Sequence, residues 1–144
     1  MATQAQEEDV AHDLPRSWVR TTLRDAFKWR SGGTPTSTNP TYYGGDIPWL
    51  IINDLTDGVV TRSQSTITQD GLERSSAKWV EPRSVLLAMY GSIGKLGIAG
   101  MRLTTNQAIA FTNPNPICGK YLFYYLLSQR AVLSKLGKGA TQRI

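Results

Sequence analysis

The chain has 144 residues, of which 40% are hydrophobic and 19% are charged, a composition typical of one globular domain with its own core. Its unbroken apolar runs are short, which excludes a membrane-spanning helix, and its single cysteine, Cys118, excludes an intramolecular disulfide bond. The polar, acidic first residues lack the pattern of a signal peptide, so we expect a cytoplasmic protein.

Positive charge is concentrated in the second half of the chain. The net charge is +5, and the acidic residues 1–16, which we expect to form a flexible tail, hide part of the excess. Eight Lys and Arg follow Glu81, with no Asp or Glu among them. Such a segment attracts polyanions, and phosphate neutralisation supplies most of the non-specific affinity for nucleic acid. A basic surface that only keeps the protein soluble is the alternative.

The first apolar positions after the tail predict a short strand followed by a helical turn. They are Trp18, Val19, Leu23, Ala26 and Phe27, at mixed spacing. Residues 28–43 are rich in Gly, Pro, Ser and Thr and predict a long loop. A connection of this length in a compact domain is more often functional than incidental.

The next strand is predicted at the apolar run 47–52. Pro48 near its start favours an edge strand or the first residues of a strand, because proline cannot donate to a central ladder. Residues 53–82 contain turn pairs between short β-branched pieces, such as 59–61 and 65–68, which predicts irregular antiparallel structure. A continuous apolar run of strand length follows at 85–89. The glycines within 91–100 then predict a hairpin-like region, and another strand is predicted at 107–111.

The clearest helix is predicted over 120–136. Its apolar stripe has helical spacing and consists of Leu122, Tyr125, Leu126, Leu133 and Leu136, with one polar interruption at Gln129. Gly137 is placed to end this helix as a left-handed cap. We therefore expect an α+β fold, an irregular, strongly twisted, mainly antiparallel sheet with a C-terminal packing helix. A surface position of the stripe, as a docking face for another helix or a partner subunit, is the alternative.

Residues suited to catalysis or metal binding are scarce. The only histidine, His12, lies in the expected tail, which argues against a histidine triad and a His/Cys metal cluster. Asp54 and Asp57 could form an acid–base pair, although their surroundings are a common turn composition. The glycine-rich segment 91–100 matches neither a P-loop nor a dinucleotide fingerprint. Its backbone amides beside Lys95 suit a DNA phosphate, and a hairpin turn with an exposed lysine is the alternative.

Taken in order, the motifs of the chain resemble the target-recognition domain of Type I restriction–modification specificity subunits. The resemblance spans residues 17–144 and rests on the order and spacing of short stretches rich in turn residues. These stretches are 31–35 with 42–49, 67–68 with 71–72 and 75–78, 84–94 running into Lys95, 105–109, and the ending at 139–142.

The resemblance implies one DNA-recognition domain at 17–144 after the acidic tail at 1–16. In the family, each such domain reads one half of a split double-stranded DNA target, and long spacer helices set the gap between the halves. Modification (methyltransferase) subunits and, through them, restriction subunits are the implied partners. S-adenosylmethionine, ATP and Mg²⁺ would belong to those subunits, so no cofactor, metal or catalytic site is expected here. The chain stops where the family continues into a spacer helix, so we expect a fragment or a half subunit that can dimerise.

Recognition without catalysis requires hydrogen-bonding side chains on loops and a positive rim. We expect base reading around 61–64 and 102–104, while the glycine and aromatic motifs shape the fold. The candidate DNA-binding residues are Thr34, Tyr42, Tyr43, Arg62, Gln64, Lys95, Arg102, Asn106, Gln107, Lys138, Gln142 and Arg143. The rival interpretation is a truncated, specificity-like module that docks on or competes for a methyltransferase subunit through the face of 121–136. A small enzyme acting on nucleic acid is disfavoured by the missing histidines and metal ligands.

Overall fold

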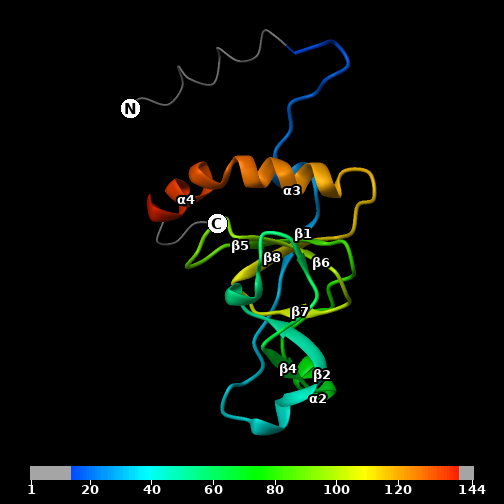
Figure 1. Cartoon of the computed structure of the whole chain (residues 1–144), viewed down its shortest axis with the longest axis vertical. Coiled ribbons are helices and arrows are strands. Elements are labelled where there is room, and N and C mark those ends of the chain that lie inside the picture. Colours follow the sequence, from blue (N-terminus) through cyan, green and yellow to red (C-terminus); the bar gives the residue numbers. More distant parts are fainter. Residues whose placement is uncertain (1–13, 140–144) are drawn as a thin grey trace.

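The computed structural model describes residues 14–139, and the side chains of the last two of these are left out. A helical layer, a five-stranded sheet and a smaller three-stranded sheet follow one another along the long axis (Figure 1). The described helices are α1 (Leu23–Ala26), α2 (Gln69–Glu73), α3 (Gly119–Ser128) and α4 (Arg130–Gly139), with 3-10 turns η1 (Pro40–Tyr42) and η2 (Ile52–Asp54). No helix within 14–139 is both long and apolar enough to cross a membrane.

The larger sheet is mostly antiparallel. Its strands, in order across the sheet, are β1 (Trp29–Ser31), β8 (Ile109–Thr112), β5 (Val85–Ala88), β6 (Leu96–Ala99) and β3 (Val59–Val60). All neighbours pair antiparallel except β3 and β6, which are parallel. The predicted hairpin is confirmed as the β5–β6 pair, and the predicted strand at 107–111 is β8.

The smaller sheet contains β4 (Ser65–Ile67), β2 (Tyr43–Leu50) and β7 (Thr104–Thr105), in that order. Strand β2 pairs antiparallel with β4 and parallel with β7. The prediction that Pro48 marks an edge strand or a strand start is wrong, because β2 is the central strand and Pro48 lies inside it. Pairing with β7 begins only at Trp49, so proline lies just before the part of β2 that is flanked on both sides.

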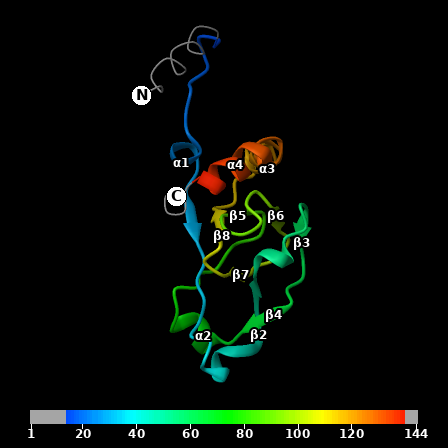
Figure 2. The same cartoon turned by 90° about the vertical axis from the view of Figure 1, so that its left-hand side faces the viewer.

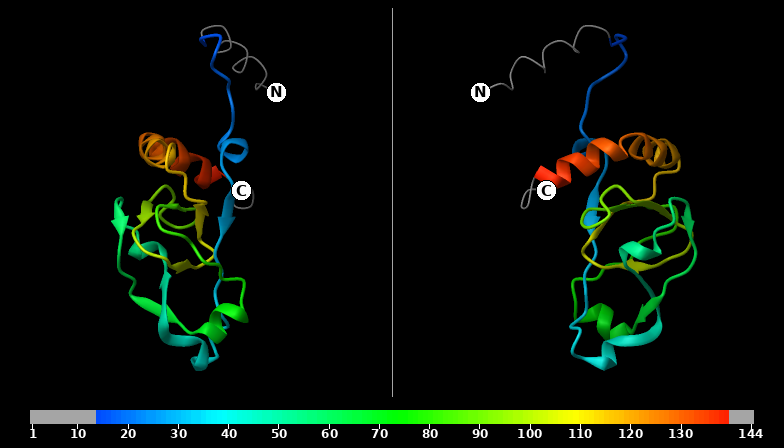
Figure 3. Two further views of the ribbon diagram at one scale, coloured as in Figure 1. Left: turned by 90° about the vertical axis from the view of Figure 1, so that its right-hand side faces the viewer. Right: turned by 60° about the vertical axis from the view of Figure 1, so that its left-hand side comes forward.

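Alternation along β5 builds two cores on opposite faces of the larger sheet. Val85 and Leu87 pack with Leu122 and Leu126 of α3. Leu86 faces the other way, into a cluster shared with the smaller sheet. Figures 2 and 3 show α3 and α4 lying over the face that carries the first of these clusters. The expected α+β fold with a mainly antiparallel sheet and a C-terminal packing element is confirmed.

The C-terminal helix differs from the prediction in two ways. The helix expected at 120–136 is interrupted at Gln129, so it forms α3 and α4. The Ser128 hydroxyl donates to the Tyr125 carbonyl at 2.6 Å, a local side-chain bond of the kind that bends helices. Gly137 is not a left-handed cap but lies inside α4 against Ile93, where a Cβ would overlap the isoleucine side chain.

The start of the domain also differs from the prediction. The helical turn is confirmed as α1, but no strand precedes it in the described residues 14–22. Trp18 and Val19 are exposed and have no sheet edge to join. The strand of this region is instead β1, which follows α1 and pairs with β8.

Candidate nucleic-acid interface

Two of the predicted DNA-binding residues, Thr34 and Gln107, are brought together from distant parts of the chain. The Thr34 hydroxyl donates to the Gln107 side-chain oxygen, and both residues are exposed. The contact uses the side-chain oxygen of Gln107 and not its amide nitrogen, which is a donor of the kind that reads base edges. Gln107 lies within the short connection from β7 of the smaller sheet to β8 of the larger sheet, so its position is set by both sheets.

The loop that carries Thr34 is fixed by the close approach of two glycines. A Cβ on Gly32 would overlap the backbone oxygen of Thr105, and a Cβ on Gly33 would overlap the backbone nitrogen of Ala77. The Gly33 amide also donates to the Thr105 carbonyl at 3.0 Å. Three of the stretches that carry the resemblance therefore touch one another here, which supports a structural role for the glycine motifs.

Tyr42, Tyr43 and Asn106 are half-buried and hold the fold together. The Tyr43 hydroxyl donates to the Pro35 carbonyl at 2.5 Å, and its ring meets the Trp49 ring edge-on. The Tyr42 carbonyl accepts the Thr68 amide at 2.9 Å. The Asn106 side chain accepts the Ala108 amide at 3.1 Å, which closes a turn before β8.

The connection between β3 and β4 presents Arg62 and Gln64 to solvent. Its shape is set by Asp54, whose carboxylate accepts the Gln64 amide at 3.0 Å and the Ile51 amide at 2.9 Å. Asp54 is buried and both its oxygens are used in this way, so it acts as a turn anchor. The two exposed side chains are consequently held on a fixed loop.

Arg102 is exposed but already has two partners. Its guanidinium lies 4.1 Å from the centre of the Trp79 ring, and its Nε lies 3.0 Å from a Glu81 carboxylate oxygen. The prediction that 102–104 reads bases is wrong for Thr104. That residue is fully buried in β7, where its hydroxyl donates to the Pro48 carbonyl at 2.8 Å.

The glycine-rich turn at 89–95 is a β-hairpin connection whose amides are mostly occupied. The Gly94 amide donates to Ala88, and the Lys95 amide donates to Ser92, each at 3.1 Å. The expectation that amides beside Lys95 form a phosphate site is therefore wrong for these two groups. The half-buried Lys95 side chain remains the cation at this turn.

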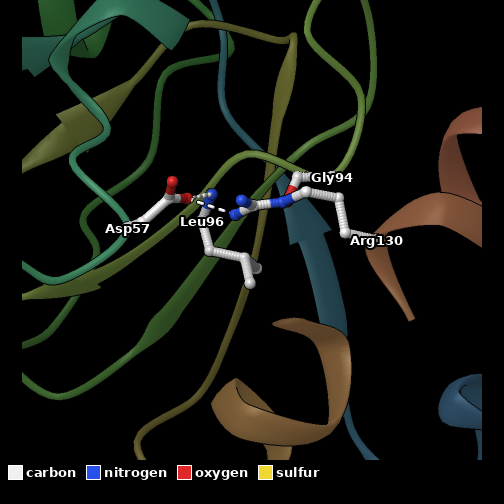
Figure 4. A network of polar contacts seen from close by, with 4 residues as sticks. All are labelled: Asp57, Gly94, Leu96 and Arg130. Atoms are coloured by element: carbon white, nitrogen blue, oxygen red, sulfur yellow. Dashed lines mark hydrogen bonds and ion pairs between the residues drawn. The ribbon is translucent and has the colours of Figure 1, made fainter. Parts of the chain in front are cut away.

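A polar network that the sequence did not indicate ties the start of α4 to this turn (Figure 4). The Arg130 guanidinium donates to the Gly94 carbonyl at 3.0 Å and forms an ion pair with Asp57. The same Asp57 oxygen accepts the Leu96 amide at 3.0 Å. Asp57 has a φ of 59°, so it sits in a left-handed turn conformation that suits Asp. Asp57 thus has a structural role, because its carboxylate is occupied by the Leu96 amide and Arg130.

Three candidate residues cannot be placed. Gln142 and Arg143 lie outside the described residues, as does His12, and the side chain of Lys138 is not described. Among the residues that are described, no three His, Cys, Asp or Glu side chains gather as metal ligands would.

A family model for the Type I restriction modification DNA specificity domain matches residues 15–144. The chain belongs to this family. Curated specificity subunits of Type I restriction enzymes are similar to it: MjaIX from Methanocaldococcus jannaschii is 29% identical over 85% of the chain, and HindI from Haemophilus influenzae is 26% identical over 89%. The EcoR124I/EcoR124II subunit from Escherichia coli is 27% identical over 81%. The chain matches 29% to 30% of the length of these relatives.

Solved structures show the same fold. The specificity domain matches the HsdS subunit from Thermoanaerobacter tengcongensis with a TM-score of 0.71, over 90% of this chain and 32% of that one, at 21% identity. A second match, from a structure of a type I R-M system, has a TM-score of 0.64 over 90% of the chain at 23% identity.

Proposed function

We propose that this specificity domain recognises one half of a split double-stranded DNA target as part of a Type I restriction–modification complex. The observation that carries the proposal is the family match, which extends over residues 15–144 and so includes nearly all of the described domain. The curated relatives are specificity subunits, about three times as long as this match. We therefore assign to the chain one recognition unit of such a subunit.

The arrangement of charge supports this function. Residues 14–139 contain 15 Lys and Arg but only 7 Asp and Glu. Three of those carboxylates are engaged within the fold, since Asp54 holds two amides, Asp57 pairs with Arg130 and Glu81 pairs with Arg102. The surface therefore keeps a cationic excess that favours a polyanion.

Base reading is proposed for exposed side chains that are held on fixed backbone. Arg62 and Gln64 lie on the loop anchored by Asp54, and Gln107 is steadied by Thr34. Arginine donates two hydrogen bonds to guanine in the major groove, while glutamine donates one to adenine and accepts one from it, so these side chains suit direct readout. Arg102 is a candidate of a different kind, because Trp79 and Glu81 already orient its guanidinium.

We propose that the chain itself carries no catalytic site. Methyl transfer with S-adenosylmethionine and cleavage with ATP and Mg²⁺ are then performed by modification and restriction subunits. The chemistry of the described residues supports this division, because Asp54 and Asp57 are both committed to turns. The role of the chain is then to determine where the complex binds on DNA.

Fluorescence anisotropy with labelled duplexes tests the recognition function. The full chain should bind duplex DNA with a strong dependence on salt, because each phosphate contact contributes about 0.9 to the slope of log K against log salt. Repeated selection from a pool of randomised duplexes should then enrich one short sequence. Failure to bind any duplex at 50 mM salt, or selection that enriches nothing, would contradict the proposal.

A second candidate function is a protein-interaction module that competes for a methyltransferase subunit. It is favoured by the outer face of α3, where Tyr121, Tyr124 and Tyr125 are exposed and the first and last of them stack. Aromatic residues are enriched at protein interfaces. Titration of a methyltransferase subunit in the absence of DNA tests it, and Tyr121→Ala with Tyr124→Ala should weaken capture without affecting duplex binding.

A further inference from the structure

A groove borders β1, one of the two edge strands of the larger sheet. One part, about 530 Å³, is lined by Arg24, Phe27, Lys28, Trp29, Arg30 and Asn113. A second hollow of about 410 Å³ is also lined by Trp29 and Arg30, so both hollows border β1. The second hollow extends to Tyr90 and Gln107, both of which are exposed. The groove thus joins a cationic end to an end with an aromatic ring and an amide.

The three cations of this groove differ from Arg102 and Arg130 in their partners. Arg102 and Arg130 are each paired with a carboxylate. No carboxylate lines either hollow, and within residues 14–139 none forms an ion pair with Arg24, Lys28 or Arg30. Asp25 is adjacent in the chain, but its carboxylate accepts the Thr22 hydroxyl at 2.9 Å. The charges of the groove are therefore available to an external anion.

The groove is also built on fixed elements. The Trp29 indole nitrogen donates to the Leu23 carbonyl at 3.0 Å, which holds α1 against β1. The Arg30 guanidinium lies 5.6 Å from the centre of the buried Phe111 ring on β8. Side chains that are already ordered lose less conformational entropy when they bind a ligand. Figure 2 shows α1 next to the start of β1, the blue arrow that follows it.

We propose that the groove along β1 holds the sugar–phosphate backbone of the duplex, with Arg24, Lys28 and Arg30 as the phosphate contacts. The inference rests on the proposed recognition function and assigns to it a surface. The phosphate end leads to Gln107, so a backbone in the groove places the neighbouring base edges beside an amide that can read them. Phe27 and Trp29 supply an apolar wall that suits the deoxyribose rings.

Paired charge variants of the full chain test this assignment. Lys28→Gln with Arg30→Gln removes two charges from the groove, and the matched control, Arg74→Gln with Lys120→Gln, removes two exposed charges that line neither hollow. The probe is a labelled duplex of random sequence at 50 and 200 mM salt. The loss of two phosphate contacts should lower the salt slope by about 1.8. The fourfold increase in salt should therefore reduce the DNA affinity of the groove variant about 12-fold less than that of the parent. Adding Arg24→Gln should remove about 0.9 more from the slope.

The control pair should keep the parent's slope, and circular dichroism melting should show that both pairs remain folded. A groove variant with the parent's slope, or a control pair with an equal loss, overturns the inference while the parent's own binding leaves the recognition function standing. A parent that binds no duplex overturns both. Tighter binding of an RNA duplex than of the DNA duplex overturns the assignment of the groove to DNA.

Discussion

Replacing Leu126 by Ala tests whether α3 is part of the core. Leu126 is fully buried and packs with Val85, Leu87 and Leu96 of the larger sheet. The substitution removes three carbon atoms, which corresponds to roughly 2–3 kcal/mol of transfer free energy at about 0.8 kcal/mol per buried CH₂. The cavity adds to this, so the free energy of unfolding should fall by about 3–5 kcal/mol.

Urea denaturation followed by tryptophan fluorescence measures this change. With a slope of about 2 kcal/mol per M for a small domain, the midpoint should fall by roughly 2 M. The matched control is Leu136→Ala, the same substitution at a residue of α4 that is 65% exposed, and it should change stability by less than about 0.5 kcal/mol. If the two midpoints move equally little, α3 does not contribute its leucines to the core and the docking interpretation of its stripe gains support.

Four further predictions concern the packing of the domain, its DNA contacts and its lack of catalytic activity. Gly33→Ala should strongly lower the melting temperature, because its Cβ would overlap backbone atoms. The control Gly58→Ala should not, since the nearest atom to its Cβ belongs to Thr56, 3.8 Å away. Equal melting temperatures would contradict the close approach at Gly33. Asp57→Ala should lower the free energy of unfolding in urea by roughly 1–3 kcal/mol, because the Leu96 amide loses its acceptor. Asp57→Asn keeps an acceptor and should lower it by less than about 1 kcal/mol, so equal losses would refute this role. Lys95→Ala should reduce the salt slope of duplex binding by about 1, and an unchanged slope would remove Lys95 from the DNA face. The purified chain should neither methylate nor cut DNA when S-adenosylmethionine and Mg²⁺ are supplied, and methyl transfer that survives rigorous purification would refute the non-catalytic assignment.

Local patterns were sufficient to predict most strands and turns of this domain. The continuous apolar run at 85–89 became β5, which is buried on both faces, as such runs favour. The turn residues around Asp57 also lie where the chain turns. These features depend on residues close together in sequence, so composition and spacing report them well.

Features that depend on distant pairing could not be predicted in the same way. Thr104 is a polar residue in a stretch that looks like an exposed loop, but it is buried. The reason is that β7 pairs with β2, a strand more than 50 residues earlier in the chain. The charge count pointed to the acid-free segment after Glu81, whereas the cationic groove comes from Arg24, Lys28 and Arg30. Their importance follows only from the β1–β8 pairing, which makes β1 a sheet edge. A linear count of charges does not contain that information.

The contacts between the motif stretches indicate where sequence specificity must arise. Gly32 approaches Thr105 and Gly33 approaches Ala77, so a side chain at either glycine would disturb the frame before it affected DNA. Buried residues such as Thr104 are likewise unable to reach a base. We therefore expect base reading from exposed side chains that project from these contacts, with Gln107 beside the groove and the 61–64 loop as the positions that fit the proposed function best. Because these side chains take no part in the three core clusters, we expect that substituting them would alter DNA recognition and leave intact the packing that positions them.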